Sequence, residues 1–224
     1  MMIKISERLK SLVKYVSSDD RLMDVGCDHA LIDIYLVQSK LIDNIVVCDV
    51  NPNALQNGID NIEKFGLTNN ITPILGYGIE KANTYHIDTV LISGLGSKNI
   101  IEILSSPNLN NVYKLILQSN NNHYELRKFL TDKGFTIYDE EIIKDGKKTY
   151  VNILAGRGRY PIDYTEAEYE FGPILSKDPR NLEYFKSLLE TYEDLLFASQ
   201  SDEIRTKVKY LEEIIESLVN EENI

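Results

Sequence analysis

Two apolar runs that each end at a carboxylate constrain the fold of this chain most. The first is RLMDVGCDHA, residues 21–30, and the second is IVVCDVNP, residues 45–52. A strand, a glycine turn, a helical pattern and a second strand ending in an acid form the first βαβ unit of a nucleotide-binding α/β domain. Asp49 stands where such an acid accepts hydrogen bonds from ribose hydroxyls. The two runs therefore predict a ligand that contains adenosine.

The residues of the first turn narrow the choice among adenosine-containing ligands. A dinucleotide site has three glycines there, because the pyrophosphate approaches the turn backbone and the helix packs closely on the strand. In this chain those positions hold Gly26, Asp28 and Leu31. A carboxylate repels a pyrophosphate but attracts a cation, so the turn favours S-adenosylmethionine, with its sulfonium and ammonium groups, over NAD. A structural alternative is that Asp28 and Asp49 cap the helices that follow them.

Strand and helix patterns alternate over residues 1–159 and predict one Rossmann-like domain that binds S-adenosylmethionine. Five strands joined by crossovers, followed by a hairpin closed by Asp145-Gly146, are the plan of an α/β class I methyltransferase. We expect a seven-stranded, mostly parallel sheet in the order 3-2-1-4-5-7-6. The expected strands span residues 21–26, 45–50, 71–75, 88–93, 113–118, 135–143 and 148–154. The expected helices span residues 4–15, 29–39, 52–65, 98–104 and 122–133.

Residues 160–224 differ in character from the rest. They carry 16 acidic and 6 basic residues, which account for most of the net charge of −11. Residues 160–180 contain three prolines and predict a connecting stretch over the surface. Apolar residues at spacings of three and four then predict two helices, over 182–196 and 204–218, that form an antiparallel coiled-coil hairpin. This C-terminal domain is either a stabilising appendage or an arm that grips a large substrate.

The composition excludes several classes of protein. No apolar run approaches the ~20 residues of a membrane span, and the N-terminus lacks the hydrophobic stretch of a signal peptide. Cys27 and Cys48 are the only cysteines and fall in expected core or turn positions, so we expect no metal site and no disulfide framework. The negative net charge opposes diffuse binding of nucleic acid but permits a local basic face. We expect a cytoplasmic protein that uses neither a membrane nor a metal.

Five segments carry a more specific pattern. They are ISERL at 5–9, DVGCDHA at 24–30, ISGLGS at 92–97, LILQSN at 115–120 and GPIL at 172–175. In this order they resemble the bacterial tRNA (adenine(22)-N(1))-methyltransferase family, known as TrmK. The resemblance implies a Rossmann-like methyltransferase domain with a C-terminal coiled coil. It also implies S-adenosyl-L-methionine as cofactor, tRNA as substrate and N1 of adenine 22 as the methylated atom.

The chain departs from that family pattern at three positions. Tyr77 stands where the family has an aspartate that meets the adenine amino group of the cofactor, so backbone groups or the Tyr77 ring would have to replace this contact. Ser97 and Ser119 replace a glycine and a proline, and neither change removes an obvious chemical group.

The residues that end the strands receive predicted roles. Asp28 is expected to stabilise the charge that develops on the methylated ring or to take a proton from its amine, and His29 to orient the base; a structural role remains the alternative for each. The predicted cofactor-binding residues are Asp24, Gly26, Cys27, Asp28, Asp49, Val50, Gly76, Tyr77, Gly78, Ser93 and Gly94. The predicted substrate-binding residues are Arg8, Leu95, Gly96, Gln118, Asn120, Arg127, Lys147 and Lys148, with Arg159 in the same basic stretch.

We expect a monomer whose partner is tRNA. Two other functions fit the same residues. A methyltransferase of a small metabolite would use the helical hairpin for dimerisation or as a lid, and small acceptors would drive its turnover. A catalytically weak RNA-binding module, impaired by Tyr77, would bind tRNA with negligible turnover.

Overall fold

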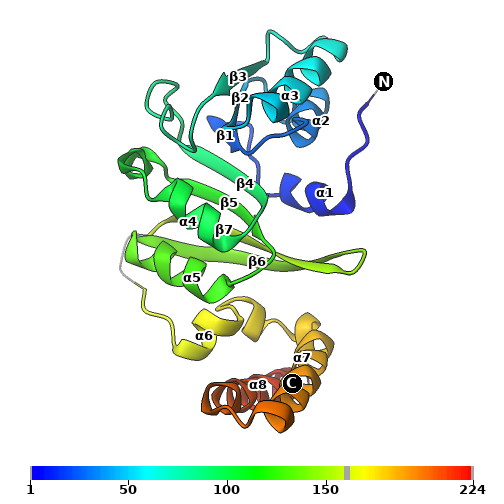
Figure 1. Cartoon of the computed structure of the whole chain (residues 1–224), viewed down its shortest axis with the longest axis vertical. Coiled ribbons are helices and arrows are strands. Elements are labelled where there is room, and N and C mark those ends of the chain that lie inside the picture. Colours follow the sequence, from blue (N-terminus) through cyan, green and yellow to red (C-terminus); the bar gives the residue numbers. More distant parts are fainter. Residues whose placement is uncertain (1, 159–161, 223–224) are drawn as a thin grey trace. The chain divides into compact units, whose positions relative to one another are not determined.

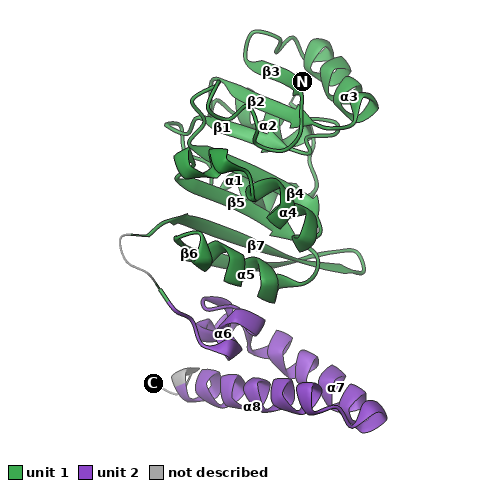
Figure 2. Cartoon of the chain, turned by 60° about the vertical axis from the view of Figure 1, so that its left-hand side comes forward, with its two compact units in different colours: residues 1–162 green, residues 163–224 purple. Residues whose placement is uncertain are grey.

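The computed structural model describes residues 2–158 and 162–222. The chain forms two compact units, Met1–Ile162 and Asp163–Ile224 (Figure 2). The predicted domain boundary between residues 159 and 160, and Arg159 itself, lie outside the described residues. Each unit has buried apolar residues of its own, Leu91 in the first and Leu211 in the second among them.

A seven-stranded sheet forms the centre of the first unit (Figure 1). Its order is β3-β2-β1-β4-β5-β7-β6, which confirms the prediction. Neighbouring strands are parallel from β3 to β5, whereas β7 is antiparallel to β5 and to β6. A tight turn joins β6 to β7, and such a connection makes two strands antiparallel. The strands are β1 Leu22–Val25, β2 Ile45–Asp49, β3 Ile71–Leu75, β4 Thr89–Leu95, β5 Lys114–Ser119, β6 Phe135–Asp145 and β7 Lys148–Arg157.

Capping residues determine where several of the helices around the sheet begin and end. Ser6 caps α1, so this helix begins at Glu7 and is shorter than expected, and Asn51 caps α3 through the Asn53 N–H. Gly66, with a φ of 69°, follows α3 as a C-terminal glycine. The helices are α1 Glu7–Val13, α2 Leu31–Gln38, α3 Pro52–Lys64, α4 Ser97–Leu104 and α5 His123–Asp132, with a 3₁₀ turn, η1, at Pro107–Asn111.

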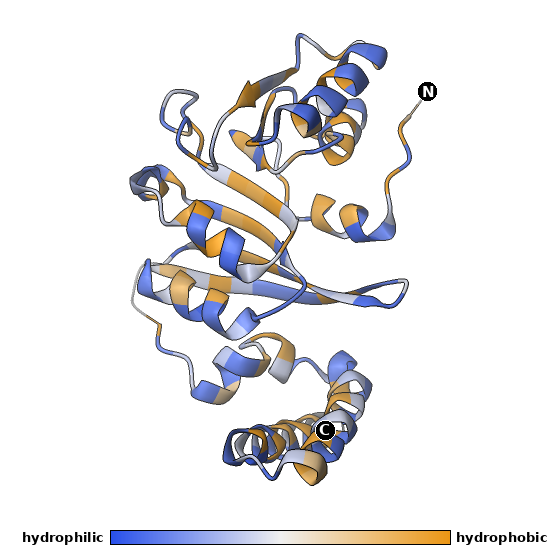
Figure 3. Cartoon of the chain, viewed as in Figure 1, coloured by the Kyte–Doolittle hydropathy of each residue, from blue (hydrophilic) through white to orange (hydrophobic). Residues whose placement is uncertain are grey.

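The core lies between the sheet and its helices, and Figure 3 shows the central strands as the most hydrophobic elements. Leu91 on β4 and Ile116 on β5 are fully buried there. Strands buried on both faces are continuous apolar runs, which is why their sequences were recognisable. Because β1 to β5 are parallel, their carboxyl ends meet at one edge, and this edge holds the turns that carry the predicted motifs.

The structure corrects the prediction that Arg127 contacts the substrate. Arg127 lies on α5 with 1% of its surface exposed, and its Nε donates to Glu140 Oε1 on β6 at 2.8 Å. Glu140 is itself 5% exposed. A charge buried at this depth requires its partner, so Arg127 ties α5 to β6 and offers RNA no surface.

Residues 163–180 belong to the second unit and contain a helix of their own. Thr165 and Glu168 form a capping box that starts a short helix, α6 Glu166–Phe171. Phe171 packs edge-on against Phe185 and Tyr192, at ring-centroid distances of 6.4 and 6.3 Å. The expected surface stretch is therefore wrong at α6, because Tyr169 and Phe171 are buried and Phe171 packs against α7.

Two long helices dominate the second unit (Figure 2). The 3₁₀ turns η2 Leu175–Lys177 and η3 Pro179–Asn181 lead into α7 Leu182–Ser199 and α8 Asp202–Glu222. The last two pack against each other through the predicted apolar stripes, with Phe185, Leu211 and Leu218 fully buried. Among the described helices, none is both long and apolar enough to cross a membrane.

Candidate active site

The turn after β1 shapes the centre of the site. Gly26, Asp28 and Ala30 have φ angles of 81°, 44° and 51°, in the left-handed region that few residue types adopt readily. The N–H groups of Gly26 and Cys27 both donate to the Cys48 carbonyl on β2, which ties the turn to the neighbouring strand. The Asp28 side chain is 61% exposed. No side chain caps α2, so the structure excludes the helix-capping alternative for Asp28.

Asp49 holds the turn from the end of β2. It is 8% exposed; its Oδ2 accepts from the Asp28 N–H at 3.3 Å and its Oδ1 from the Asn51 N–H at 2.8 Å. Asn51, rather than Asp49, caps α3. The carboxylate is thus fixed between two loops with its free lone pairs available to a ligand.

Two adjoining cavities run along this edge of the sheet. The first, of about 310 Å³, has Arg8 in its wall, and the second, of about 440 Å³, has Asp49; we call them the Arg8 cavity and the Asp49 cavity. Gly26, Asp28 and Leu95 line both. Another cavity of about 440 Å³ lies at the amino ends of the strands. Ligands of parallel sheets bind at the carboxyl ends, so the first two form the candidate site.

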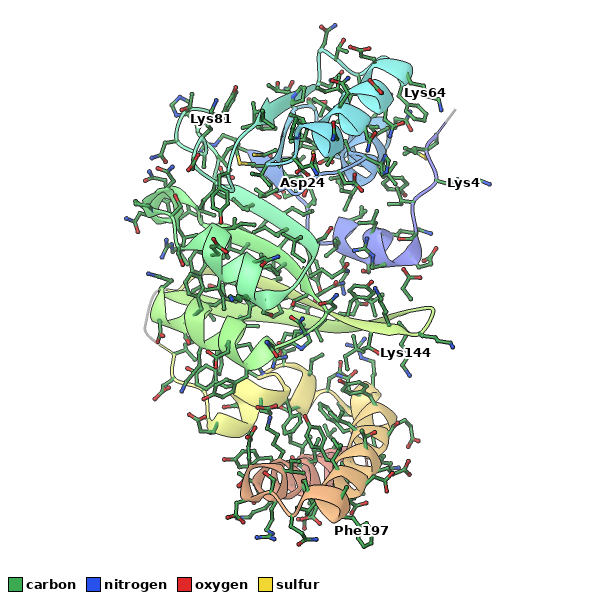
Figure 4. All side chains as sticks on the ribbon, in the orientation of Figure 1. Lys4, Asp24, Lys64, Lys81, Lys144 and Phe197 are labelled. Carbon is green, nitrogen blue, oxygen red and sulfur yellow. The ribbon has the colours of Figure 1, made fainter. Side chains whose placement is uncertain are left out.

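Ten of the eleven predicted cofactor-binding residues line these cavities, and Figure 4 labels Asp24 among them. Asp24, Cys27, Ser93 and Gly94 line the Arg8 cavity, and Asp49, Val50, Tyr77 and Gly78 line the Asp49 cavity, while Gly26 and Asp28 line both. Gly76 is the exception: it lines neither cavity, and its N–H donates to the Asp49 carbonyl. His29 lines the Arg8 cavity with its Nε2 3.7 Å from Asp28 Oδ2.

The predicted substrate-binding residues are more scattered. Arg8 and Leu95 line the cavities, but Gly96 does not. Asn120 is exposed just after β5, at the same edge. Lys147 and Lys148 are exposed on the β6–β7 hairpin, where Figure 4 labels the neighbouring Lys144.

Gln118 positions Arg8 rather than facing the cavity. It is fully buried, its Oε1 accepts from Arg8 Nη1 at 2.5 Å, and its Nε2 donates to Asn152 Oδ1 at 2.6 Å. The Arg8 guanidinium also lies 5.2 Å from the ring centroid of Tyr150. A Cβ at Gly94 would lie 3.4 Å from Arg8 Nη1, so glycine leaves room for this side chain. The expected contact of Gln118 with the base is therefore wrong; Gln118 fixes Arg8 beside the cavity.

A pair of buried carboxyl groups lies beneath the Arg8 cavity. Burial, with the nearby Asp33 carboxyl, raises the pKa of Asp24 well above its usual range. Burial also raises the pKa of Asp33 on α2 to about 7, although a hydrogen bond from Asp24 opposes this shift. No N–H donor of the described residues is hydrogen-bonded to either Asp33 oxygen. Both carboxyl groups therefore hold their protons more tightly than an exposed aspartate does.

Replacing Asp33 by asparagine is expected to stabilise the protein at pH 8 by about 1 kcal/mol. In the wild type the pKa of Asp33 is about 7 when folded, above the ordinary value of 3.8, so folding takes up protons and stability falls as the pH rises between these values. Asparagine removes the buried charge and keeps the size of the side chain. Calorimetry should show a melting temperature raised by about 2–4 °C at pH 8. At pH 5 we expect a smaller rise; an equal rise at both values, or one shared by the exposed control Asp43→Asn, would contradict the prediction.

Comparison with known proteins agrees with this geometry. Residues 5–153 match the model of a methyltransferase domain family. The tRNA (adenine(22)-N(1))-methyltransferase of Bacillus subtilis is 25% identical, over 96% of each chain. A candidate tRNA (m1A22) methyltransferase from Streptococcus pneumoniae, in complex with S-adenosyl-L-methionine, is 31% identical over 95% of this chain and 100% of its own, with a TM-score of 0.86. The chain belongs to the TrmK family. TrmK of M. capricolum, in complex with S-adenosyl-homocysteine, is 28% identical over 96% of this chain and 99% of its own, with a TM-score of 0.85.

Several residues of this TrmK-family site had no signal in the sequence. Asn152 and Tyr150 lie on β7; Asn152 contacts Gln118 on the neighbouring strand β5, and Tyr150 contacts Arg8 on α1. Glu102 lines the Asp49 cavity from α4. Within residues 2–158 and 162–222, no three His, Cys, Asp or Glu side chains are grouped to hold a metal ion.

Proposed function

We propose that this chain transfers a methyl group from S-adenosyl-L-methionine to N1 of adenine 22 in tRNA. The observation that carries the proposal is the position of Asp28, an exposed carboxylate where the two cavities meet. A cofactor on one side of it and a target base on the other would both lie within its reach. The TrmK relatives support the choice of substrate and target atom.

The two cavities fit the parts of the cofactor. Asp49 is placed for the ribose hydroxyls, and Val50 and Ile103 give the same cavity apolar walls that suit adenine. Asp24 lines the Arg8 cavity, where its carboxyl oxygens can accept hydrogen bonds from the ammonium of the methionine part. S-adenosylmethionine supplies an electrophilic methyl group on its sulfonium sulfur.

Asp28 and the walls of the Arg8 cavity would serve the transfer itself. The N1 lone pair forms the new bond to the methyl carbon while the carbon–sulfur bond breaks and its electrons stay on sulfur. N1 is unprotonated at neutral pH, so alignment of the three atoms contributes more than a strong base. The methylated ring becomes cationic. The Asp28 carboxylate stabilises that charge or accepts a proton from the exocyclic amine, and His29 beside it orients the base.

The RNA contacts follow from exposed groups near this edge. Adenine N1 is engaged inside a folded tRNA, so the nucleotide must leave its stack at a cost of roughly a few kcal/mol. Lys147, Lys148 and Asn120 are exposed and can meet phosphates or the sugar. Arg8, held by Gln118, presents a fixed guanidinium to the base or its phosphate. We infer a cytoplasmic monomer, consistent with tRNA as the substrate.

The test is methyl transfer from labelled S-adenosylmethionine to an unmodified tRNA transcript, with the label mapped by nuclease digestion. Label in 1-methyladenosine at position 22, and none in a transcript with guanine at that position, supports the proposal. Turnover with small acceptors but not with tRNA would favour a metabolite methyltransferase. Binding of tRNA and cofactor without transfer to any substrate would favour an inactive RNA-binding module.

A further inference from the structure

Two polar residues that were not predicted as site residues, Asn99 and Glu102, line the Asp49 cavity. Asn99, Glu102 and Ile103 line this cavity from α4, and their spacing of three and four places them on one face of the helix. Ile103 and Val50 contribute apolar surface to the same cavity. Glu102 lines this apolar slot as well, and it is exposed to solvent.

The loop after β3 is fitted against this helix. A Cβ at Gly78 would lie 3.1 Å from Ile103 Cγ2, so the glycine permits a close approach of the loop to α4. Tyr77 in that loop donates its hydroxyl proton to Glu102 Oε1 at 2.6 Å. This bond raises the pKa of Tyr77, so the phenol remains a donor, and it leaves Glu102 Oε2 as an acceptor beside the slot. Tyr77 thus positions Glu102.

Adenine presents a complementary edge to these polar side chains. Its exocyclic amine is a donor and its N1 is an acceptor, while hypoxanthine has an oxygen acceptor in place of the amine and an N–H donor at N1. A carboxylate accepts hydrogen bonds only, so one that faces the exocyclic position distinguishes the two bases. The Asn99 amide, one turn before Glu102, can donate to N1.

We propose that Glu102, positioned by Tyr77, is the residue that selects adenine in the cofactor by accepting a hydrogen bond from its exocyclic amine. The inference rests on the proposed function, because it assumes that the Asp49 cavity holds the adenosine part of S-adenosylmethionine. It assigns the specificity of the cavity to a side chain on α4 rather than to the loop after β3.

Calorimetric titration with two product analogues tests the assignment. S-adenosylhomocysteine carries adenine, and S-inosylhomocysteine carries hypoxanthine at the same position. The wild type is expected to bind the adenine form at least about tenfold more tightly. In Glu102→Gln the ratio of the two Kd values should fall to about one. The glutamine amide can rotate, so that its oxygen accepts from the adenine amine or its N–H group donates to the hypoxanthine oxygen. The matched control is Glu80→Gln, which removes an exposed acid near Tyr77 that does not line the cavity.

The outcomes separate this inference from the proposed function. If the wild type binds neither analogue, the proposed function fails. If it binds both analogues and Glu102→Gln keeps the wild-type ratio, the assignment of Glu102 is wrong while the cofactor site stands. Tyr77→Phe should lower the ratio of the two Kd values in the wild-type background and leave it unchanged in the Glu102→Gln background. An equal loss in both backgrounds would exclude a positioning role for Tyr77.

Discussion

Replacing Asp28 by asparagine is expected to slow methyl transfer to tRNA by about 10²–10⁴-fold, the range of a lost acid–base or charge-stabilising group. The change removes the charge and keeps the shape of the side chain. Asparagine tolerates the left-handed backbone of this position, where φ is 44°, so the turn should persist. Asp28→Ala should lose methylation as well, but alanine strains this backbone and is the less clean variant.

Single-turnover rates, together with the Kd values for tRNA and S-adenosylhomocysteine, check the prediction for Asp28→Asn. Binding of both ligands should stay within about threefold of wild type, because Asp28 holds the turn through its backbone N–H rather than its side chain. Asp43→Asn, an exposed acid in another loop, serves as the matched control. Near-normal turnover of Asp28→Asn would remove Asp28 from the catalytic residues.

The sheet was predictable because its signals are local. The buried strands are apolar runs, helices such as α1 and α3 have a capping side chain or a terminal glycine, and crossovers between parallel strands restrict the order. Asp49 and Asp28 were predictable for a related reason: the carboxyl end of a strand has a fixed place in this topology. Both line the cavities where their positions in the sequence placed them.

The contacts that correct the prediction join residues far apart in the sequence. Gln118 bonds to Arg8, 110 residues away, and to Asn152, 34 residues away. Arginine is usually a surface residue, and only the fold shows that Arg127 forms a buried ion pair with Glu140. Local periodicity does not show which distant side chain a residue will contact. The sequence therefore predicted neither the contacts of Gln118 nor that of Arg127. The short helix α6 has a different reason for its weak signal: it spans only six residues, and prolines occur on both sides of it in residues 160–180.

Replacing Asp49 by asparagine is expected to weaken binding of S-adenosylhomocysteine by about 10–100-fold, the effect of losing hydrogen bonds to a charged acceptor. The loss has two physical sources. The amide offers the ribose fewer lone pairs, and it cannot accept from both Asp28 N–H and Asn51 N–H as the carboxylate does. Asp60→Asn is the control, since Asp60 lies exposed on α3 and bonds to Gln56 on the same helix.

The kinetic signature of Asp49→Asn should be the opposite of that of Asp28→Asn. Saturating S-adenosylmethionine should restore kcat to within about threefold of wild type, because the lost interaction serves binding in the ground state and the transition state alike. The KM for the cofactor should rise with the Kd from calorimetry. If kcat stayed low at saturation while Kd was unchanged, Asp49 would act on the transfer itself, and the Asp49 cavity would no longer be the place for the ribose.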